Sequence, residues 1–185
     1  MKQISNQLYN LSLSIQNEKI NLPILKEKRI DLFIKREDLI HPFVSGNKFR
    51  KLKYNLAEAQ AQNKETLLTF GGAFSNHIVA TAVAGKLNGF KTIGVIRGEE
   101  LAENFEETIA ENATLREAQK HGMIFKFISR TAYRDKENMD FLNDLIIEFG
   151  DFYLIPEGGT NSLAVKGCQE ILTEQDTIFD YICLA

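Results

Sequence analysis

Residues 66–89 read TLLTFGGAFSNHIVATAVAGKLNG, and this stretch decides the fold class. The apolar run from Leu67 to Phe70 predicts a short buried strand, because it is bounded by polar residues and by glycines. The segment from Ser75 to Leu87 is rich in alanine and valine and predicts a helix. This helix ends at Asn88-Gly89, where glycine suits the residue that follows a helix. A strand, a glycine turn and a helix in this order open a βαβ unit.

The same alternation of strand and helix continues along the chain. Further buried strands are predicted at Thr92–Ile96, Met123–Ile128 and Phe152–Ile155, and helices at Ala113–Lys120 and Lys136–Phe149. Helices of this length between strands give right-handed crossovers and a parallel sheet. The predicted fold class is therefore α/β.

The two ends of the chain follow a different pattern. Ile30–Lys35 is strand-like, and a loop then leads into a helix at Asn47–Gln62. Near the other end we expect a helix at Ser162–Leu172 and a buried strand at Asp180–Ala185. The acidic stretch from Glu99 to Glu111 is interpreted as a solvated loop and helix start, not as a cation site.

Composition and charge exclude several classes of function. A net charge of −3, with 22 basic and 25 acidic residues, gives no general attraction for nucleic acid. Cys168 and Cys183 are too few and too far apart for a disulfide framework or a metal site, so we expect buried thiols in a reducing compartment. His41 and His121 have no ligands at metal spacing, so no metal is expected.

Residues 1–10 contain no apolar leader, and no run of about 18 apolar residues occurs, which predicts a cytoplasmic protein outside the membrane.

Lys48 is the first candidate for chemistry. A lysine amine attacks an aldehyde only when it is deprotonated, so such a lysine needs an apolar or cationic pocket that lowers its pKa. Arg36, Arg50 and Lys51 could supply the cationic part. On local sequence alone, a lysine at a helix start is more often a solvated surface residue. A P-loop is excluded, because the first glycine of that motif is absent and Phe49 stands in place of its hydroxyl residue.

Two glycine motifs predict helix starts that could bind anions. In Gly71-Gly72-Ala73-Phe74-Ser75-Asn76-His77, the glycines allow close backbone approach, and the next helix points free N–H groups into the crevice above the strand ends. On local sequence alone, Ser75 or Asn76 more often serves only as a helix cap, although capping and anion binding are compatible. Gly158-Gly159-Thr160-Asn161 opens the last helix and allows the same two interpretations.

Three segments together resemble the pyridoxal-phosphate enzymes of the aminocyclopropane-carboxylate deaminase and D-cysteine desulfhydrase family: Lys35-Arg36-Glu37-Asp38-Leu39, Ser45-Gly46-Asn47-Lys48 and the Gly71–His77 motif. The resemblance extends from about Leu22 to Ala185. It implies the tryptophan synthase β-like fold of type II, a three-layer αβα arrangement around a parallel sheet. It also implies that residues 1–52 and 156–185 belong to a larger cofactor-binding lobe, and residues 53–155 to a smaller open α/β lobe.

The resemblance further implies an activity and a set of site residues. The cofactor would be pyridoxal 5′-phosphate, and the reaction would be the deamination of a small amino acid to a 2-oxoacid and ammonia. D-Cysteine desulfhydration to pyruvate, hydrogen sulfide and ammonia is the alternative, which histidine at position 77 favours, because deaminases tend to carry glutamine there. Lys48 would hold the cofactor and then move protons at the substrate. Ser75 would be catalytic and bind substrate, and Asn76 would contact both cofactor and substrate. The remaining implied residues are Asn47 and His77 for the substrate, and Gly158, Gly159 and Thr160 lining the cleft.

The chain departs from the family at its C-terminus. In the family, the last expected strand runs into a loop that grips the cofactor phosphate, and this chain stops before that loop. It looks like the N-terminal half of an enzyme that would be a homodimer when full length. We therefore expect residues 1–185 alone to bind the cofactor poorly and to show no measurable activity. A second hypothesis is an inactive, cofactor-free fragment or binding domain. A third, a nucleotide-binding α/β domain, lacks a Gly-x-Gly-x-x-Gly motif after any strand.

Overall fold

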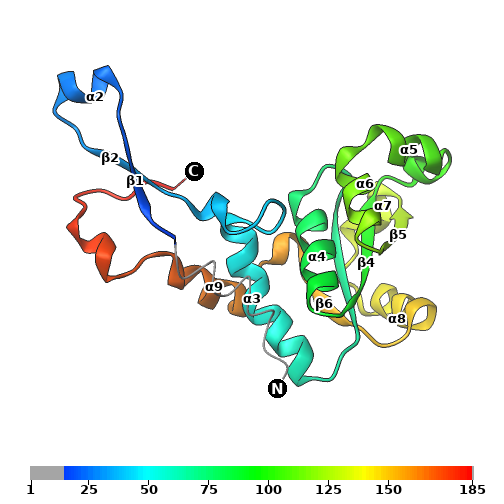
Figure 1. Cartoon of the computed structure of the whole chain (residues 1–185). Helices are drawn as coiled ribbons and strands as arrows, with labels where there is room; N and C mark the ends of the chain where they lie inside the picture. The colour runs from blue at the N-terminus through cyan, green and yellow to red at the C-terminus, as the bar shows by residue number, and fades with distance from the viewer. Residues whose placement is uncertain (1–14, 185) are drawn as a thin grey trace.

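The computed structural model describes residues 15–184 and shows an elongated chain. An α/β unit lies at one end, and the helices α3 (Gly46–Ala61) and α9 (Ser162–Cys168) cross in the middle (Figure 1). At the other end, β1 (Asn17–Ile20) pairs antiparallel with β2 (Leu32–Lys35), and the short helix α2 (Pro23–Lys28) connects them.

The α/β unit is built on one parallel sheet. Its strands are β3 (Thr66–Gly72), β4 (Lys91–Arg97), β5 (Met123–Ile128) and β6 (Tyr153–Ile155), in the spatial order β5-β4-β3-β6. All three pairings are parallel, as helical crossovers require. The four strands predicted from the apolar runs are confirmed.

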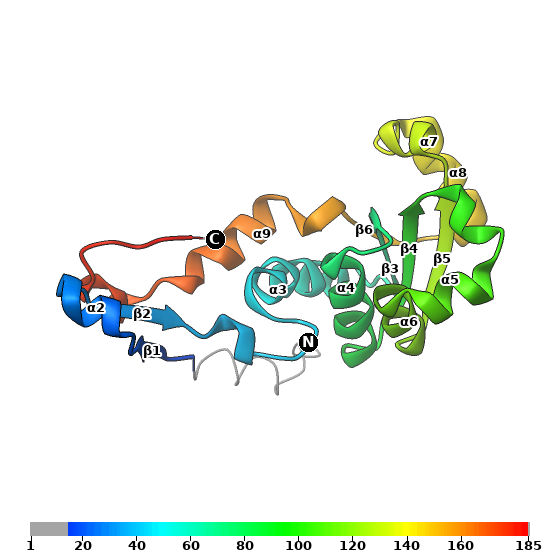
Figure 2. The same ribbon diagram turned by 90° about the horizontal axis from the view of Figure 1, so that it is seen from above.

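Helices cover both faces of this sheet. One face packs against α4 (Asn76–Leu87), α6 (Ala113–Lys120) and α3, and the other against α7 (Arg130–Arg134) and α8 (Met139–Phe149) (Figure 2). Because successive strand residues point to opposite faces, Leu67 enters the first core and Leu68 the second. The expected three-layer αβα class is therefore confirmed.

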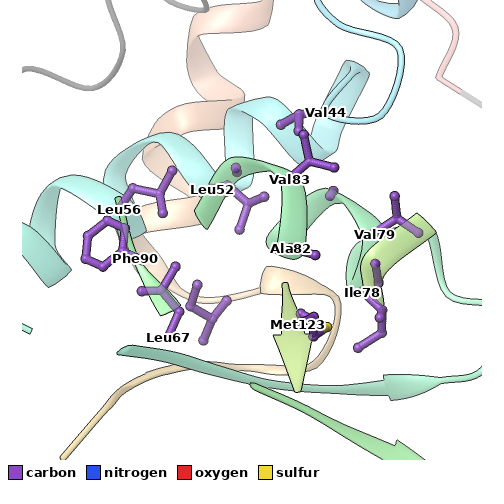
Figure 3. Close-up of a cluster of buried hydrophobic side chains, with 14 of the residues drawn as sticks. Val44, Leu52, Leu56, Leu67, Ile78, Val79, Ala82, Val83, Phe90 and Met123 are labelled. Carbon is purple, nitrogen blue, oxygen red and sulfur yellow. The ribbon is translucent and has the colours of Figure 1, made fainter. Parts of the chain in front are cut away.

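The larger core fixes α3 against the α/β unit. Leu52 and Leu56 of α3 lie in the same cluster as Val83 of α4, Leu67 of β3 and Met123 of β5 (Figure 3). Full burial of one such aliphatic side chain stabilises a protein by about 1.5–3 kcal/mol. This packing sets the position of the first turn of α3 relative to the strand ends. The expected lobe boundary between residues 52 and 53 falls inside this continuous helix.

Two helices differ in length from the prediction. The helix expected from Lys136 begins at Met139, because the Asn138 side chain accepts a hydrogen bond from the N–H of Asp140 and caps it there. The helix expected to reach Leu172 ends at Cys168 and continues as a 3₁₀ turn, Gln169–Ile171. The acidic stretch forms the 3₁₀ turn Glu99–Ala102 and the helix α5 (Phe105–Glu111), and its glutamates are exposed, as expected.

The prediction of a buried strand at Asp180–Ala185 is wrong for residues 180–184. They form no strand, and the exposed fractions of Tyr181 and Leu184 are 89% and 87%. A buried parallel strand needs neighbouring strands for its backbone groups, and none of the described residues forms one beside this segment. The prediction of buried thiols is also wrong, because Cys168 is half-buried and Cys183 is exposed.

A charged network holds the C-terminal segment against the β1–β2 sheet. The Asp176 carboxylate accepts hydrogen bonds from Lys35 Nζ at 2.8 Å and from Asn17 Nδ2 at 2.8 Å. Burial alone would raise the pKa of Asp176, but these hydrogen bonds and those of Thr173 lower it. The carboxylate therefore stays charged, and the segment keeps a defined position without a strand.

Residues 1–10, on which the expectation of no leader rests, lie outside the described part of the chain. Within residues 15–184, no helix combines the length and the apolar character that a membrane span requires.

Candidate active site

Two segments far apart in sequence meet beyond the carboxyl end of β6. Lys48 and Lys51 lie on the first turns of α3, and the turn Glu157–Gly159 follows β6. Lys48 Nζ donates to the carbonyl oxygen of Gly158 at 3.5 Å, and Lys51 Nζ donates to Thr160 Oγ1 at 2.9 Å. Residues three apart share one face of a helix, so both ammonium groups face the same turn.

Hydrogen bonds between the Asn55 and Asn161 side chains hold this turn in place. Asn161 Nδ2 donates to Asn55 Oδ1 at 2.7 Å, and the Tyr153 hydroxyl donates to the same oxygen at 3.2 Å. Asn161 Oδ1 also accepts from the N–H of Ala164 at 2.9 Å and so caps α9. The residue after the Gly-Gly-Thr motif thus ties α3, β6 and α9 together.

The surroundings of Lys48 favour its neutral amine. The side chain is half-buried, and burial lowers the pKa of Lys48, with the Lys51 charge adding to the effect. Of the three cations proposed to act on it, Lys51 is the one that does so. Arg36 pairs with Asp38 and Glu18, and Arg50 pairs with Glu37, so their charges are matched elsewhere.

The Gly71–His77 motif forms the turn between β3 and α4. Ser75 Oγ accepts from the N–H of His77 at 3.3 Å and caps α4, which begins at Asn76. The Asn76 side chain is exposed at this helix start, and Asn47 is exposed at the start of α3. Strands β3 and β6 are parallel, α4 follows β3, and the Gly158 turn follows β6. The unpaired N–H groups at the start of α4 therefore lie at the same edge of the sheet as the Gly158 turn.

The His77 side chain lies inside the protein. Its exposed fraction is 1%, and Nε2 lies 2.9 Å from Thr69 Oγ1. Burial, with the charges of Lys48 and Lys51, lowers the pKa of His77 to about 3, so the ring is neutral. Gly159 has φ of +74°, a conformation that favours glycine, and a methyl group there would also make a tight contact of 3.1 Å with the ring.

Sequence reasoning missed three members of this arrangement. The sequence marks Lys51 only as a source of charge, and it does not mark Thr69 or Asn55. The spacing of Lys48 and Lys51, three residues apart in a predicted helix, could have shown that both face one side. Thr69 and Asn55 carry no such signal, because their partners are distant in sequence.

A comparison with solved structures defines the class of protein. No family model matches the chain. A crystal structure described as a homologue of ACC (1-aminocyclopropane-1-carboxylate) deaminase matches with a TM-score of 0.69 and 25% identity, over 95% of this chain and 55% of that one. The chain therefore has the tryptophan synthase β-like fold of type II.

Comparison with curated proteins narrows this class to one group. A protein of Pyrococcus horikoshii, named provisionally as a 1-aminocyclopropane-1-carboxylate deaminase, is 31% identical over 88% of this chain and 49% of its own length. The mitochondrial bifunctional D-cysteine desulfhydrase/1-aminocyclopropane-1-carboxylate deaminase of Arabidopsis thaliana is 32% identical over 87% of this chain and 40% of its own. Over most of its length, the chain is thus homologous to the aminocyclopropane-carboxylate deaminase and D-cysteine desulfhydrase group. It spans about half the length of these relatives. Because the plant relative is mitochondrial by name, a cytoplasmic location stays a prediction.

Proposed function

We propose that this chain supplies the lysine-bearing part of a pyridoxal-phosphate enzyme that deaminates a small amino acid to a 2-oxoacid and ammonia, as an ACC deaminase does. The observation that carries the proposal is the half-buried Lys48, whose pKa is lowered beside the Gly158 turn. The names of the relatives support the substrate class.

The residues present fit the aldehyde of the cofactor and offer one cation to its phosphate. Its aldehyde needs a deprotonated amine, which burial and Lys51 favour at Lys48. Its phosphate needs cations or free N–H groups, and Lys51 Nζ stands at the Thr160 hydroxyl on the same turn. When bound, the cofactor supplies an electron sink for the carbanion formed at the substrate.

The chain's own groups would then divide the work. Lys48 would hold the cofactor, and its amine, once released, would take and return protons at the substrate carbons. The free N–H groups of α4 and the Ser75 hydroxyl would hold the substrate carboxylate, because a helix start favours an anion. Asn76 would contact the cofactor ring, and Asn47 would contact the substrate from the start of α3.

Desulfhydration of D-cysteine is the second candidate, favoured by the bifunctional name of the plant relative. The products separate the two activities. With the cofactor present, 2-oxobutanoate released from 1-aminocyclopropane-1-carboxylate indicates the deaminase, and pyruvate with hydrogen sulfide from D-cysteine indicates the desulfhydrase. Release of neither by the full-length protein that carries this sequence would favour a binding domain instead.

The lobe arrangement and the assembly belong to the same proposal. Residues 1–52 and 156–185 would contribute to a larger cofactor-binding lobe, and residues 53–155 would form the smaller one. The full-length protein would be a homodimer.

Ser75 and Asn76 should affect different steps. Ser75→Ala should raise KM or lower kcat with the visible cofactor spectrum nearly intact, because its hydroxyl would act on the substrate. Asn76→Ala should shift that spectrum. A hydrogen bond to a charged group is worth about 1.5–3 kcal/mol, so each activity effect should be roughly 10- to 150-fold. Wild-type kinetics in both variants would mean that these residues only cap α4.

A further inference from the structure

The buried ring of His77 lies where three elements of the α/β unit meet. It lies on the first turn of α4, contacts Thr69 on β3, and borders Gly159 after β6. Thr81 Oγ1, one turn further along α4, lies 3.5 Å from the same ring nitrogen. The ring thus lies between the sheet and the turn to which Lys48 and Lys51 donate.

The hydrogen bonds of Thr69 define the tautomer of His77. A threonine hydroxyl has one hydrogen. The Thr69 hydroxyl donates it to the carbonyl oxygen of Ile155 at 2.9 Å, so toward His77 Nε2 the same oxygen can only accept. Nε2 therefore carries the ring hydrogen, and Nδ1 carries the lone pair.

This leaves an acceptor on the side of Gly159. His77 Nδ1 is fully buried, and no described residue donates a hydrogen bond to it. A methyl group added to Gly159 would stand 3.5 Å from Nδ1, so this atom faces the turn. An orphaned buried acceptor costs about 1–3 kcal/mol, and a cost of this size points to a role beyond packing.

Charge explains why the ring must stay neutral. Protonation of Nδ1 would add a third positive charge near Lys48 and Lys51, on a ring that is itself buried. The Nε2–H tautomer avoids this charge and leaves the Nδ1 lone pair on the side of Gly159. A neutral glutamine side chain could supply the same donor and acceptor, whereas leucine supplies neither.

We propose that His77 is a positioning residue, which, as the neutral Nε2–H tautomer bonded to Thr69, holds the Gly158–Gly159 turn where Lys48 Nζ can donate to it. His77 is not a substrate ligand in this account, which replaces the role that the family resemblance implies. The inference rests on the proposed function only in naming Lys48 as the cofactor lysine.

The first test is the tautomer itself. The protein contains three histidines, so ¹⁵N NMR of the cofactor-free chain can resolve their ring nitrogens. We expect one histidine to show an unprotonated Nδ1 and a protonated Nε2, with no titration between pH 5 and 8, and its signals should be missing in His77→Gln. An Nδ1–H tautomer, or titration of His77 in this range, would overturn the proposal.

The second test is the reactivity of the Lys48 amine without cofactor. Trace acetic anhydride followed by peptide mass spectrometry compares Lys48 with the exposed Lys91 across pH. In His77→Leu, Lys48 should lose contact with the turn and become more solvated, so its labelling should require a higher pH, approaching that of Lys91. His77→Gln should restore the wild-type profile. A folded His77→Leu protein with an unchanged Lys48 profile would show that His77 only fills space.

A third variant covers the case in which His77→Leu does not fold. Thr69→Val keeps the shape of the side chain but removes the acceptor of the His77 Nε2 hydrogen. It should shift both the NMR signals of the His77 ring and the labelling profile of Lys48. Thr69→Ser keeps the hydroxyl and should shift neither. These readouts use no cofactor, so they can fail while Lys48 still proves to be the cofactor lysine. Equally, the readouts can confirm the role of His77 even if Lys48 proves not to be the cofactor lysine.

Discussion

Replacing Lys48 by alanine should abolish the release of 2-oxoacid by the full-length protein that carries this sequence. General acid–base catalysis by one positioned side chain contributes about 10²–10⁴-fold, and Lys48 would also provide the attachment of the cofactor. We therefore expect a loss of more than about 10³-fold at saturating pyridoxal phosphate, measured by a coupled assay of the 2-oxoacid, with circular dichroism confirming the fold.

Two other lysines serve as controls. Lys51→Ala should weaken cofactor binding and make the Lys48 amine less reactive near neutral pH, because the neighbouring charge that helps to lower its pKa is removed. Lys91→Ala, at an exposed position, should change nothing. Activity of Lys48→Ala within tenfold of wild type would remove Lys48 from the chemistry.

Gly167→Ala should destabilise the chain although it lies in a helix. In a helix interior, alanine is more favourable than glycine by about 1 kcal/mol. At Gly167, however, a Cβ atom would stand 1.9 Å from the backbone oxygen of Arg50, so α9 and α3 would have to separate. Overpacking costs about 1–3 kcal/mol or more, and no flexible side chain can yield here. We expect a net loss on the order of 2 kcal/mol in the free energy of unfolding, measured in urea.

The control for Gly167→Ala is Val165→Ala on the same helix. Val165 is exposed, so its replacement should stay within about 0.5 kcal/mol of wild type. Separation of α9 from α3 should also draw the Gly158–Thr160 turn away from Lys48 and lower the reactivity of its amine near neutral pH. A Gly167→Ala protein as stable as wild type would contradict the close crossing of these helices.

The sequence predicts the parts of the fold that depend on local pattern. The four strands and α6 follow from short apolar runs and glycine stops, which act within a few residues. The strand predicted at Asp180–Ala185 shows the limit of this reasoning, because an apolar run forms a buried strand only beside partner strands. The start of α8 differs from the prediction for a local reason, because Asn138 caps the helix at Met139.

The site divides in the same way. Lys48 and Ser75 can be found from motifs, because helix starts and glycine turns have short-range signatures. The burial of His77 cannot be predicted from a motif, since a histidine on the first turn of a helix is as readily solvated as buried. Its position depends on Thr69 and Gly159, which tertiary packing brings to it.

The most direct test of the account is to map where pyridoxal phosphate reacts. The full-length protein that carries this sequence is incubated with pyridoxal phosphate near neutral pH, reduced with borohydride, digested, and analysed by mass spectrometry. Because the pKa of Lys48 is lowered, its amine should react at a lower pH than exposed lysines, and the pyridoxyl group should be found mainly on the peptide containing Lys48. A label on Lys51 or Lys53, or one spread evenly over surface lysines, would contradict the central claim that Lys48 holds the cofactor.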